Sequence, residues 1–347
     1  MKLPPARFRL LRGHTPQSTS ILFSTTTKSF ICRRGSCRKP QWVFQRFLSA
    51  FCIRAGPVCA AAVAMNVDLW LHAVNSPEAL SAALRKFTSM SPELCLGIEC
   101  DIRCCSRTSR PVLSHDPLHH RHSTDDAGPT ESPMPLSGLC EGLHSVASTT
   151  EGRRCVLKLD FKDQLAAVLV AEGKVPEVQR LASQSAIQLW FNADVIACDA
   201  TDTKSFRTSF PNPVRLAQLA VVSFPVVSFG FHRPANATLP YHEGDADAVE
   251  EFYSAALPLR SEGQAEKIVA VTLPLRLSLF RESENAQGAV RAMLTSAADA
   301  LRRCHGGSQS RDRRVFLTVW RGREETIDDA DVAWLAATFG GCTVDRD

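Results

Sequence analysis

The sequence predicts an α/β fold of the (β/α)8, or TIM-barrel, class. From residue 66 onward, short apolar runs alternate with longer stretches of helical periodicity, the pattern of repeated βα units. The apolar runs number eight, and the 282 residues from 66 to 347 are close to the ~250 of a barrel with modest loop insertions. One barrel domain, residues 66–347, therefore accounts for the pattern, and a basic extension, residues 1–65, precedes it.

The eight predicted strands are short, apolar and bounded by polar or turn-forming residues. They lie at residues 67–74, 95–104, 154–162, 187–196, 226–231, 268–275, 315–321 and 342–344. A further extended run, residues 111–116, follows the second strand. Strands that alternate with helices pair in parallel, so we expect their C-terminal ends to meet at one mouth of the barrel.

Helical periodicity is clearest just after the first strand. Ser76 supplies an N-cap and Pro77 the first helical position, and Leu80, Leu84 and Phe87 recur on one face. The predicted helices are residues 77–87, 136–146, 163–183, 214–222, 246–256, 286–303 and 328–337. Each of them follows one predicted strand or extended run, as a barrel requires.

The composition is that of a globular protein, but the charge is unevenly distributed. Hydrophobic residues make up 44% and charged residues 22% of the chain, which is typical of a packed domain. Residues 1–65 hold 11 Lys and Arg and no Asp or Glu, which leaves 29 basic residues against 36 acidic ones. The net charge of +4 thus belongs to the extension, and the remainder gives no reason to expect nucleic-acid binding.

The basic extension leaves two interpretations open. Its Arg, Ser and Thr content without acids is typical of a transit peptide, which would direct the protein to mitochondria. Alternatively, translation begins at Met65 and the protein is cytoplasmic. Secretion is disfavoured, because the apolar run after Val58 lies far from the N-terminus and the 13 cysteines show no regular spacing. No apolar run reaches the ~18 residues that a membrane span needs.

Three carboxylates lie near the ends of the second and third predicted strands, where barrel enzymes carry their chemistry. Glu99 and Asp101 are two residues apart and so face the same side of one strand, and Asp160 lies on the next. Together they would form an oxygen-rich site for one divalent cation, Mg²⁺ or Ca²⁺. Taken singly, each carboxylate is more simply a solvated strand edge.

Two histidines and two lysines accompany these carboxylates along the chain. His72 ends the first strand, His115 lies in the extended run after the second, and Lys158 and Lys162 flank the third-strand aspartate. Histidines at strand ends suit acid–base chemistry, and a lysine beside a cation site suits an anion. The structural alternative is a histidine whose hydrogen bonds are satisfied within the fold.

Two further strands carry side chains that could line a substrate pocket. Trp190, Asn192 and Asp194 alternate along the fourth strand, so all three are predicted to face the interior. Their structural alternative is a hydrogen-bond network without a ligand. Trp320 ends the seventh strand beside Arg321, where it would either bind a head group or pack at the rim.

The order of these residues along the chain resembles that of a known superfamily, the phospholipase C-like phosphodiesterases, which include the glycerophosphodiester phosphodiesterases. The similar order is His72, Glu99-x-Asp101, His115-Asp116 and Asp160-x-Lys162. More closely, residues 72–76 (HAVNS), 158–162 (KLDFK) and 192–194 (NAD) resemble the menorin family, a divergent branch of that superfamily. The resemblance covers roughly residues 70–230.

The resemblance implies a TIM barrel that cleaves a phosphodiester, such as a glycerophosphodiester or a lysophospholipid. His72 and His115 would act as general base and general acid, in either order, and Lys162 would contact the phosphate. The three carboxylates would hold the cation that neutralises charge on the phosphoryl oxygens. Further substrate contacts would come from Lys158, Asn192, Asp194 and Trp320.

Two departures separate the chain from these patterns. Ala73 follows the first histidine, where the phosphodiesterases usually have an arginine that helps to bind phosphate. Asp116 follows the second histidine, as in the enzymes and unlike most menorin relatives, and would orient its imidazole. We therefore expect an enzyme, and the alternative is a non-catalytic barrel that binds a protein partner.

Overall fold

The computed structural model describes residues 67–118, 133–150, 152–198, 201, 203–234, 237–257, 268–304, 314–322, 325–340 and 342–344. All of them belong to one compact unit, Pro57–Asp347. The interpretations offered for the basic extension, residues 1–65, lie outside these residues. Across the described ranges, no helix combines the length and the apolar character that a membrane crossing requires.

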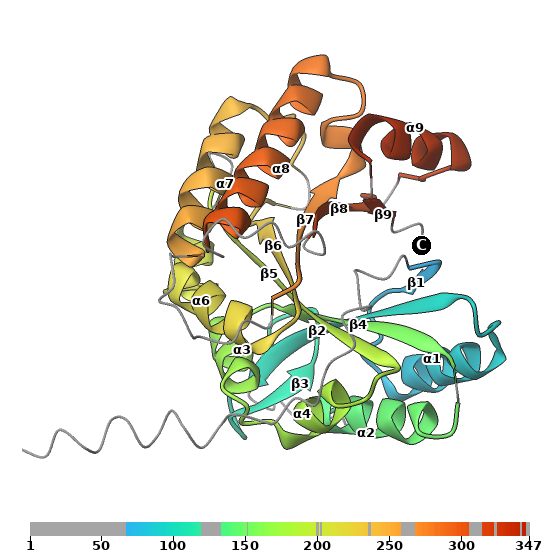
Figure 1. Cartoon of the computed structure of the whole chain (residues 1–347). Helices are drawn as coiled ribbons and strands as arrows, with labels where there is room; N and C mark the ends of the chain where they lie inside the picture. The colour runs from blue at the N-terminus through green and yellow to red at the C-terminus, as the bar shows by residue number, and fades with distance from the viewer. Residues whose placement is uncertain are drawn as a thin grey trace, which may run out of the picture. The chain divides into compact units, whose positions relative to one another are not determined.

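Eight parallel strands form one curled sheet (Figure 1). They follow one another across the sheet in chain order as β1 (Leu69–Leu71), β2 (Cys95–Cys105), β4 (Arg154–Phe161), β5 (Ile187–Ile196), β6 (Val226–Phe231), β7 (Ala270–Arg276), β8 (Arg314–Trp320) and β9 (Cys342–Val344). The extended run after β2 is a ninth strand, β3 (Arg110–Leu113), which pairs antiparallel with β2. Each of the eight predicted strands therefore has its counterpart in the parallel sheet.

The two edges of the parallel sheet are β1 and β9. Within the described ranges, these two strands are not paired with each other. The part of the prediction that the structure establishes is thus a mixed α/β fold with a curled parallel sheet, in the manner of a half-barrel. Its curvature brings the C-terminal strand ends toward a common space, which is where a barrel-type site would lie.

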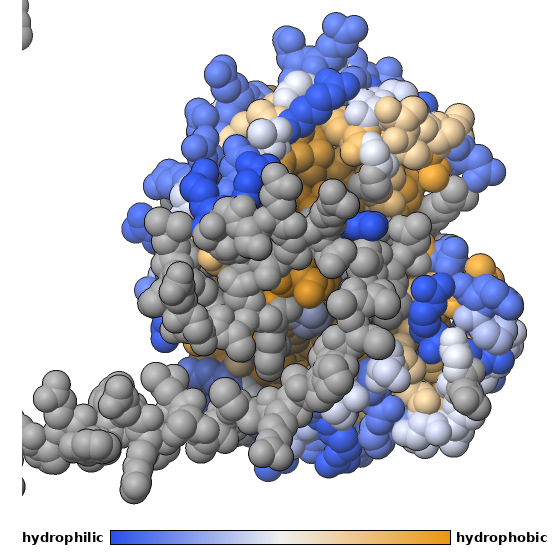
Figure 2. Space-filling view, viewed as in Figure 1, coloured by the Kyte–Doolittle hydropathy of each residue, from blue (hydrophilic) through white to orange (hydrophobic). Residues whose placement is uncertain are grey.

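Helices flank the outer face of the sheet (Figure 1). They are α1 (Pro77–Ser89), α2 (Leu136–Ala147), α3 (Gln164–Ala171), α4 (Pro176–Ala182), α5 (Thr203–Ser209), α6 (Pro213–Ser223), α7 (Glu243–Ala256), α8 (Glu284–Cys304) and α9 (Asp329–Phe339). Hydrophilic side chains cover much of the solvent side of α7 and α8 (Figure 2). The apolar faces of these helices are consequently available to pack on the sheet.

The predicted helix at residues 163–183 is two helices in the structure. Gly173 has a φ of 73°, a left-handed conformation that ends α3, and Pro176 starts α4 at its first turn. The side chain of Asp163 caps α3 by accepting a hydrogen bond from the amide of Ala166 at 2.9 Å.

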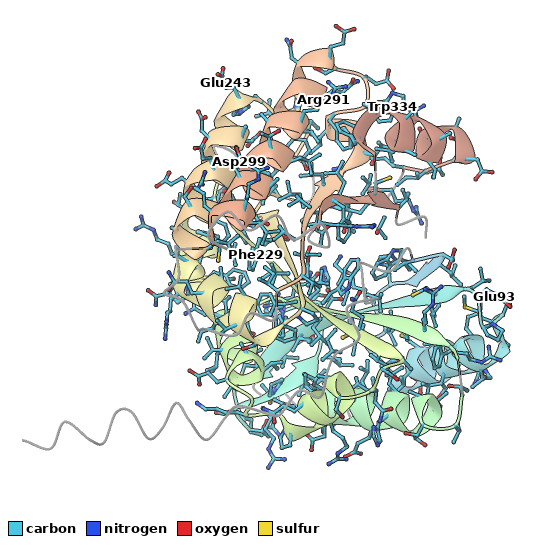
Figure 3. All side chains as sticks on the ribbon, in the orientation of Figure 1. Glu93, Phe229, Glu243, Arg291, Asp299 and Trp334 are labelled. Atoms are coloured by element: carbon cyan, nitrogen blue, oxygen red, sulfur yellow. The ribbon has the colours of Figure 1, made fainter. Side chains whose placement is uncertain are left out.

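Two layers of apolar side chains hold the sheet in place. Outside the curl, Phe229 of β6 packs on Phe252 and Tyr253 of α7 with ring centroids 5.4 and 5.8 Å apart. In Figure 3, Phe229 lies between strand and helices, whereas Glu243 extends away from α7. This outer layer fixes the position of each strand and hence of the side chains at its end.

A separate aromatic cluster fills the inner side of the curl. Trp190 contacts Trp70 and Phe316 in edge-on arrangements, with ring centroids 5.7 and 5.5 Å apart. Smaller apolar side chains complete this cluster: Cys95, Val156, Val226 and Ala270. The predicted inward orientation of Trp190 is confirmed. The cluster lies next to the polar residues that come after it along the strands.

Candidate functional site

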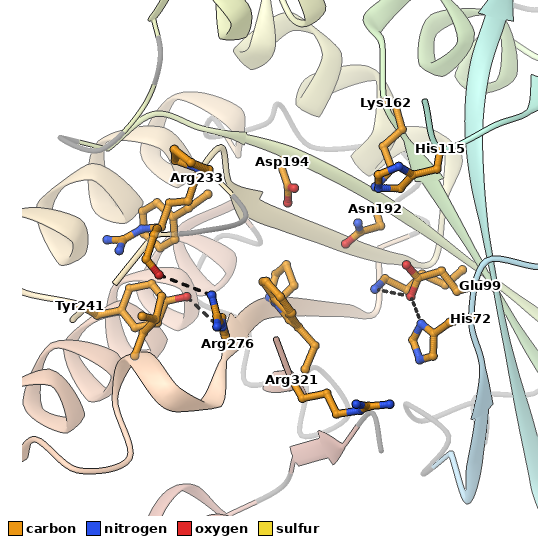
Figure 4. A pocket seen from close by; sticks show the side chains of 17 residues that line it. His72, Glu99, His115, Lys162, Asn192, Asp194, Arg233, Tyr241, Arg276 and Arg321 are labelled. Carbon is orange, nitrogen blue, oxygen red and sulfur yellow. Dashed lines mark hydrogen bonds and ion pairs between the residues drawn. The ribbon is translucent and has the colours of Figure 1, made fainter. Parts of the chain in front are cut away.

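A pocket of about 450 Å³ lies where the parallel strands end (Figure 4). Its lining includes eight of the ten residues that the sequence indicated as site residues: His72, Glu99, His115, Lys158, Lys162, Asn192, Asp194 and Trp320. The other two, Asp101 and Asp160, lie next to the lining, at 3.0 and 2.6 Å from the ammonium of Lys162. All ten predicted residues thus come together around one pocket.

The three predicted metal ligands form a compact acidic group. One oxygen from each of Glu99, Asp101 and Asp160 lies within 4.8 Å of the others. The parallel register explains this grouping, because Asp101 on β2 is the direct neighbour of Asp160 on β4 and Glu99 points to the same face. Carboxylate oxygens at these separations fit a hard divalent cation, so the group could hold Mg²⁺ or Ca²⁺.

Two lysines already compensate much of this negative charge. Lys158 Nζ lies 3.0 Å from Glu99 Oε2, and Lys162 Nζ lies between Asp101 and Asp160. Burial by itself would raise the pKa of Glu99, but Lys158 and His72 outweigh it and hold that pKa below its usual range. Burial opposes the charge on Lys162, yet Asp160 and Asp101 raise the pKa of that lysine, so it is charged.

Asn192 connects the acidic group to the fourth strand of the parallel sheet. Its amide nitrogen donates a hydrogen bond of 2.8 Å to Asp160 Oδ1, because the two residues are direct neighbours on β5 and β4. The side chain is only 3% exposed, and its Oδ1 finds no partner within the described part of the chain. A buried acceptor of this kind at a pocket wall is available to a cation or to a donor on a ligand.

Asp194 lies two residues further along β5 and borders the same pocket. A Cβ atom added at Gly230 on β6 would overlap Asp194 Oδ1, so glycine is needed there for the carboxylate to occupy its place. Burial raises the pKa of Asp194 to about 7, and the nearby charge of Asp160 contributes to the shift. The protonation state of this carboxyl therefore changes near neutral pH.

Each predicted catalytic histidine has a carboxylate at Nδ1. In His72 the partner is Glu99 Oε2 at 3.2 Å, and in His115 it is Asp116 Oδ1 at 2.9 Å. A carboxylate at Nδ1 favours the tautomer with its proton there and orients the ring. The two rings differ in position, because the His115 side chain is 69% exposed at the rim and the His72 side chain only 26%.

Asn75 is a site residue to which the sequence gave no role, although it lies in the HAVNS motif of residues 72–76. Its amide nitrogen donates to Asp101 Oδ2 at 2.7 Å, and its Oδ1 accepts from the Asp101 backbone amide at 2.9 Å. The turn that directs Asn75 back onto β2 contains Ala73 with a φ of 47°, a left-handed conformation that costs about 1–2 kcal/mol for a residue other than glycine. Such strain next to His72 is typical of a functional turn.

The wall opposite the acidic group carries three arginines and a tyrosine. Arg233, Arg276 and Arg321 follow or close β6, β7 and β8, and Tyr241 lies in the segment before α7. Arg233 Nη2 is 2.6 Å from Asp245 Oδ2, and its guanidinium carbon lies 4.5 Å from the ring centroid of Tyr241. The rule that function lies at strand ends would have indicated Arg276, because that residue ends its strand.

Comparison of the chain with known protein families finds no matching family model, and comparison with curated proteins finds no significant match. The resemblance to the menorin family therefore stays a prediction that rests on the motifs quoted for it. What the site does has to be argued from its own geometry, since a fold of this kind supports many activities.

Proposed function

We propose that the chain is a divalent-metal-dependent phosphodiesterase of the menorin-like branch, with its eight strands closed into a (β/α)8 barrel. The substrate would be a small phosphodiester, such as a glycerophosphodiester or a lysophospholipid-like molecule. The observation that carries the proposal is the acidic group of Glu99, Asp101 and Asp160 in contact with a pocket that two carboxylate-bound histidines also line. Acid–base groups beside a cation site are what phosphodiester cleavage requires.

The charges of the acidic group are consistent with binding of a cation first and of an anionic substrate afterwards. Counted for the acidic group alone and with all three carboxylates ionised, the two ammonium groups of Lys158 and Lys162 leave one net negative charge. A divalent cation would turn this into one net positive charge, which matches the single negative charge of a phosphodiester. Mg²⁺ or Ca²⁺ bound by the carboxylates would neutralise developing charge on the phosphoryl oxygens, and Lys162 would contact one of them.

The two histidines supply the proton transfers. One imidazole accepts the proton of the attacking hydroxyl, from water or from the substrate itself, as that oxygen bonds to phosphorus. The other donates a proton to the leaving oxygen as its bond to phosphorus breaks. Glu99 and Asp116 each lie at Nδ1 of one ring, where they stabilise the imidazolium form. Asn192, Asp194 and Trp320 would position the substrate at the pocket wall.

A second candidate function is a non-catalytic module that binds a protein partner. One observation favours it: both oxygens of Asp160 already have partners, Lys162 and Asn192, and both oxygens of Asp101 are engaged by Lys162 and Asn75. A site satisfied in this way is stable without a cation. The two functions therefore differ first in whether the site binds a metal at all.

Calorimetric titration of Mg²⁺ and Ca²⁺ into the full chain tests the proposal. We expect one binding site in the wild type and none in the double variant Glu99→Gln, Asp101→Asn, because two of the three charged ligands are then neutral. Thermal unfolding of both proteins shows whether the variant keeps its fold. Equal binding in wild type and variant would refute these ligands, and absence of binding in both would favour the interaction module.

Replacement of Asn75 by alanine is expected to weaken metal binding by about 10- to 100-fold, as loss of a group that orients a ligand usually does. Asp101 would keep its charge but lose the two hydrogen bonds that hold its side chain and its backbone amide. The same titration measures the effect. Gln218→Ala, which removes an amide bonded to the carbonyl of Ala255, is a matched control and should bind metal as the wild type does.

A further inference from the structure

The positively charged side chains of the pocket differ in whether a carboxylate neutralises their charge. Five of them line it, and four have a carboxylate at ion-pair distance: Lys158 with Glu99, Lys162 with Asp160, Arg233 with Asp245, and Arg276 with Glu325. The fifth, Arg321, has no carboxylate partner in the ranges that the structure describes. An arginine without a counter-charge at a pocket wall is a binding group for an anion.

Among the described residues, the carboxylate that follows Arg321 most closely in sequence is Glu325, and other groups already engage it. Glu325 accepts hydrogen bonds from Arg276 Nε at 2.9 Å and from Ser278 Oγ at 2.7 Å. Its second oxygen accepts from the backbone amide of Gly322 at 2.7 Å. Arg321 instead donates from Nη1 to the main-chain oxygen of Glu325 at 2.9 Å, which fixes its position without neutralising its charge.

The turn that carries Arg321 lies against the side chain of Arg276. A Cβ atom added at Gly322 would overlap the guanidinium of Arg276, so a larger residue there would displace that guanidinium. The Nε of Arg321 is buried and has no partner among the residues placed by the structure. The hydrogen bond from Nη1 to the main-chain oxygen of Glu325 keeps the guanidinium in its place at the pocket wall.

The position of Arg321 in the sheet separates it from Lys162. It follows β8, whereas Lys162 follows β4, and three strands of the parallel sheet lie between these two. Figure 4 shows the two side chains on different sides of the pocket. Beside Arg321, the indole of Trp320 is 36% exposed and offers an apolar surface to the part of a ligand that spans the pocket.

We propose that Arg321 binds a second anionic group of the substrate, a carboxylate or a phosphate, at a distance from the phosphodiester that reacts near Lys162. The inference rests on the proposed function, because it takes the acidic side of the pocket as the place of the reacting diester. It narrows the substrate class to phosphodiesters whose alcohol carries an additional acid. A planar guanidinium with free donors matches both oxygens of such a group.

Two soluble probes that differ by one carboxylate test this subsite. Glycerophosphoserine and glycerophosphoethanolamine share the phosphodiester and the amine, and only the first has the additional acid. In calorimetric titrations with Mg²⁺ present, the wild type should bind the serine ester at least about tenfold more tightly, the effect of a hydrogen-bonded charge pair. Arg321→Gln should abolish this preference and leave the affinity for the ethanolamine ester within about twofold of the wild type.

Two further variants complete the test. Arg321→Lys keeps the charge but loses the planar fork, so it should retain only part of the preference. Arg302→Gln removes an exposed arginine of α8 that pairs with Asp299, and should behave as the wild type. The subsite would be overturned if the wild type bound the two probes with equal affinity. It would also be overturned if Arg321→Gln weakened the binding of both probes equally, or if the wild type bound neither probe at millimolar concentration.

The two proposals fail in distinguishable ways. A preference for glycerophosphoserine that depends on Arg321, with neither probe hydrolysed, would refute the phosphodiesterase activity and retain the anion subsite. If both probes were hydrolysed and bound with equal affinity, the proposed phosphodiesterase activity would stand and the anion subsite would be refuted. Release of the alcohol, together with the phosphomonoester or cyclic phosphate that remains, is followed separately from binding and therefore decides between them.

Discussion

Replacement of Lys162 by methionine is expected to lower the free energy of unfolding of the metal-free protein by about 3 kcal/mol, the lower end for breaking a buried ion pair. The ammonium lies 2.6 Å from Asp160 and 3.0 Å from Asp101, and both aspartates are buried. Without it, their charges face each other with only hydrogen bonds from Asn192 and Asn75 to stabilise them. Urea unfolding in the presence of a chelator measures the loss.

The same variant is expected to bind Mg²⁺ and Ca²⁺ more tightly than the wild type. The ammonium of Lys162 holds the two aspartates that a cation would use, so its removal takes away a competing positive charge. Added metal should then stabilise the variant more than the wild type, since a ligand that binds only the folded state raises its stability. Phosphodiester cleavage should nevertheless be lost, because the phosphate contact is gone.

Lys174→Met is the matched control for this prediction. Lys174 pairs with Glu172 at 2.7 Å, but its side chain is 60% exposed, and an exposed ion pair contributes little to stability. A Lys162→Met protein that is as stable as the wild type without metal would mean that the aspartates are not both charged. Weaker metal binding in that variant would place the cation outside the acidic group.

The sequence predicted the strands well and the helices less completely. The bounds predicted for the apolar runs of β5 and β6 agree with the structure. The break between α3 and α4 was missed because apolar residues occur on both sides of it, although Gly173 and Pro176 mark it. The short helix α5 was missed because its polar sequence carries no apolar stripe.

The ten predicted site residues come together for reasons that a sequence contains. Residues two apart on a strand share a face, and parallel strands in chain order place Asp101 beside Asp160. Two features depended instead on three-dimensional geometry. The role of Asn75 follows from the left-handed conformation of Ala73. That Arg321 has no carboxylate partner among the described residues follows from the contacts of Glu325 with Arg276 and Gly322.

Replacement of His115 by glutamine is expected to lower kcat for glycerophosphodiesters by about 100- to 10,000-fold, the usual contribution of a general acid or base. The ring is largely exposed at the rim and Asp116 holds its Nδ1 at 2.9 Å. A leaving alcohol departs toward the rim, so we expect His115 to be the acid. His72→Gln should lower kcat over the same range, because His72 lies deeper, on Glu99, and acts as the base.

The leaving group separates these two roles. A diester of p-nitrophenol needs no proton on its leaving oxygen, so His115→Gln should cleave it at nearly the wild-type rate, whereas His72→Gln should stay impaired because its nucleophile still needs a base. His144→Gln is the control, since His144 bonds to Gln184 and does not border the pocket. The reverse pattern would exchange the two roles, and full activity of both variants with both substrates would remove the histidines from the reaction.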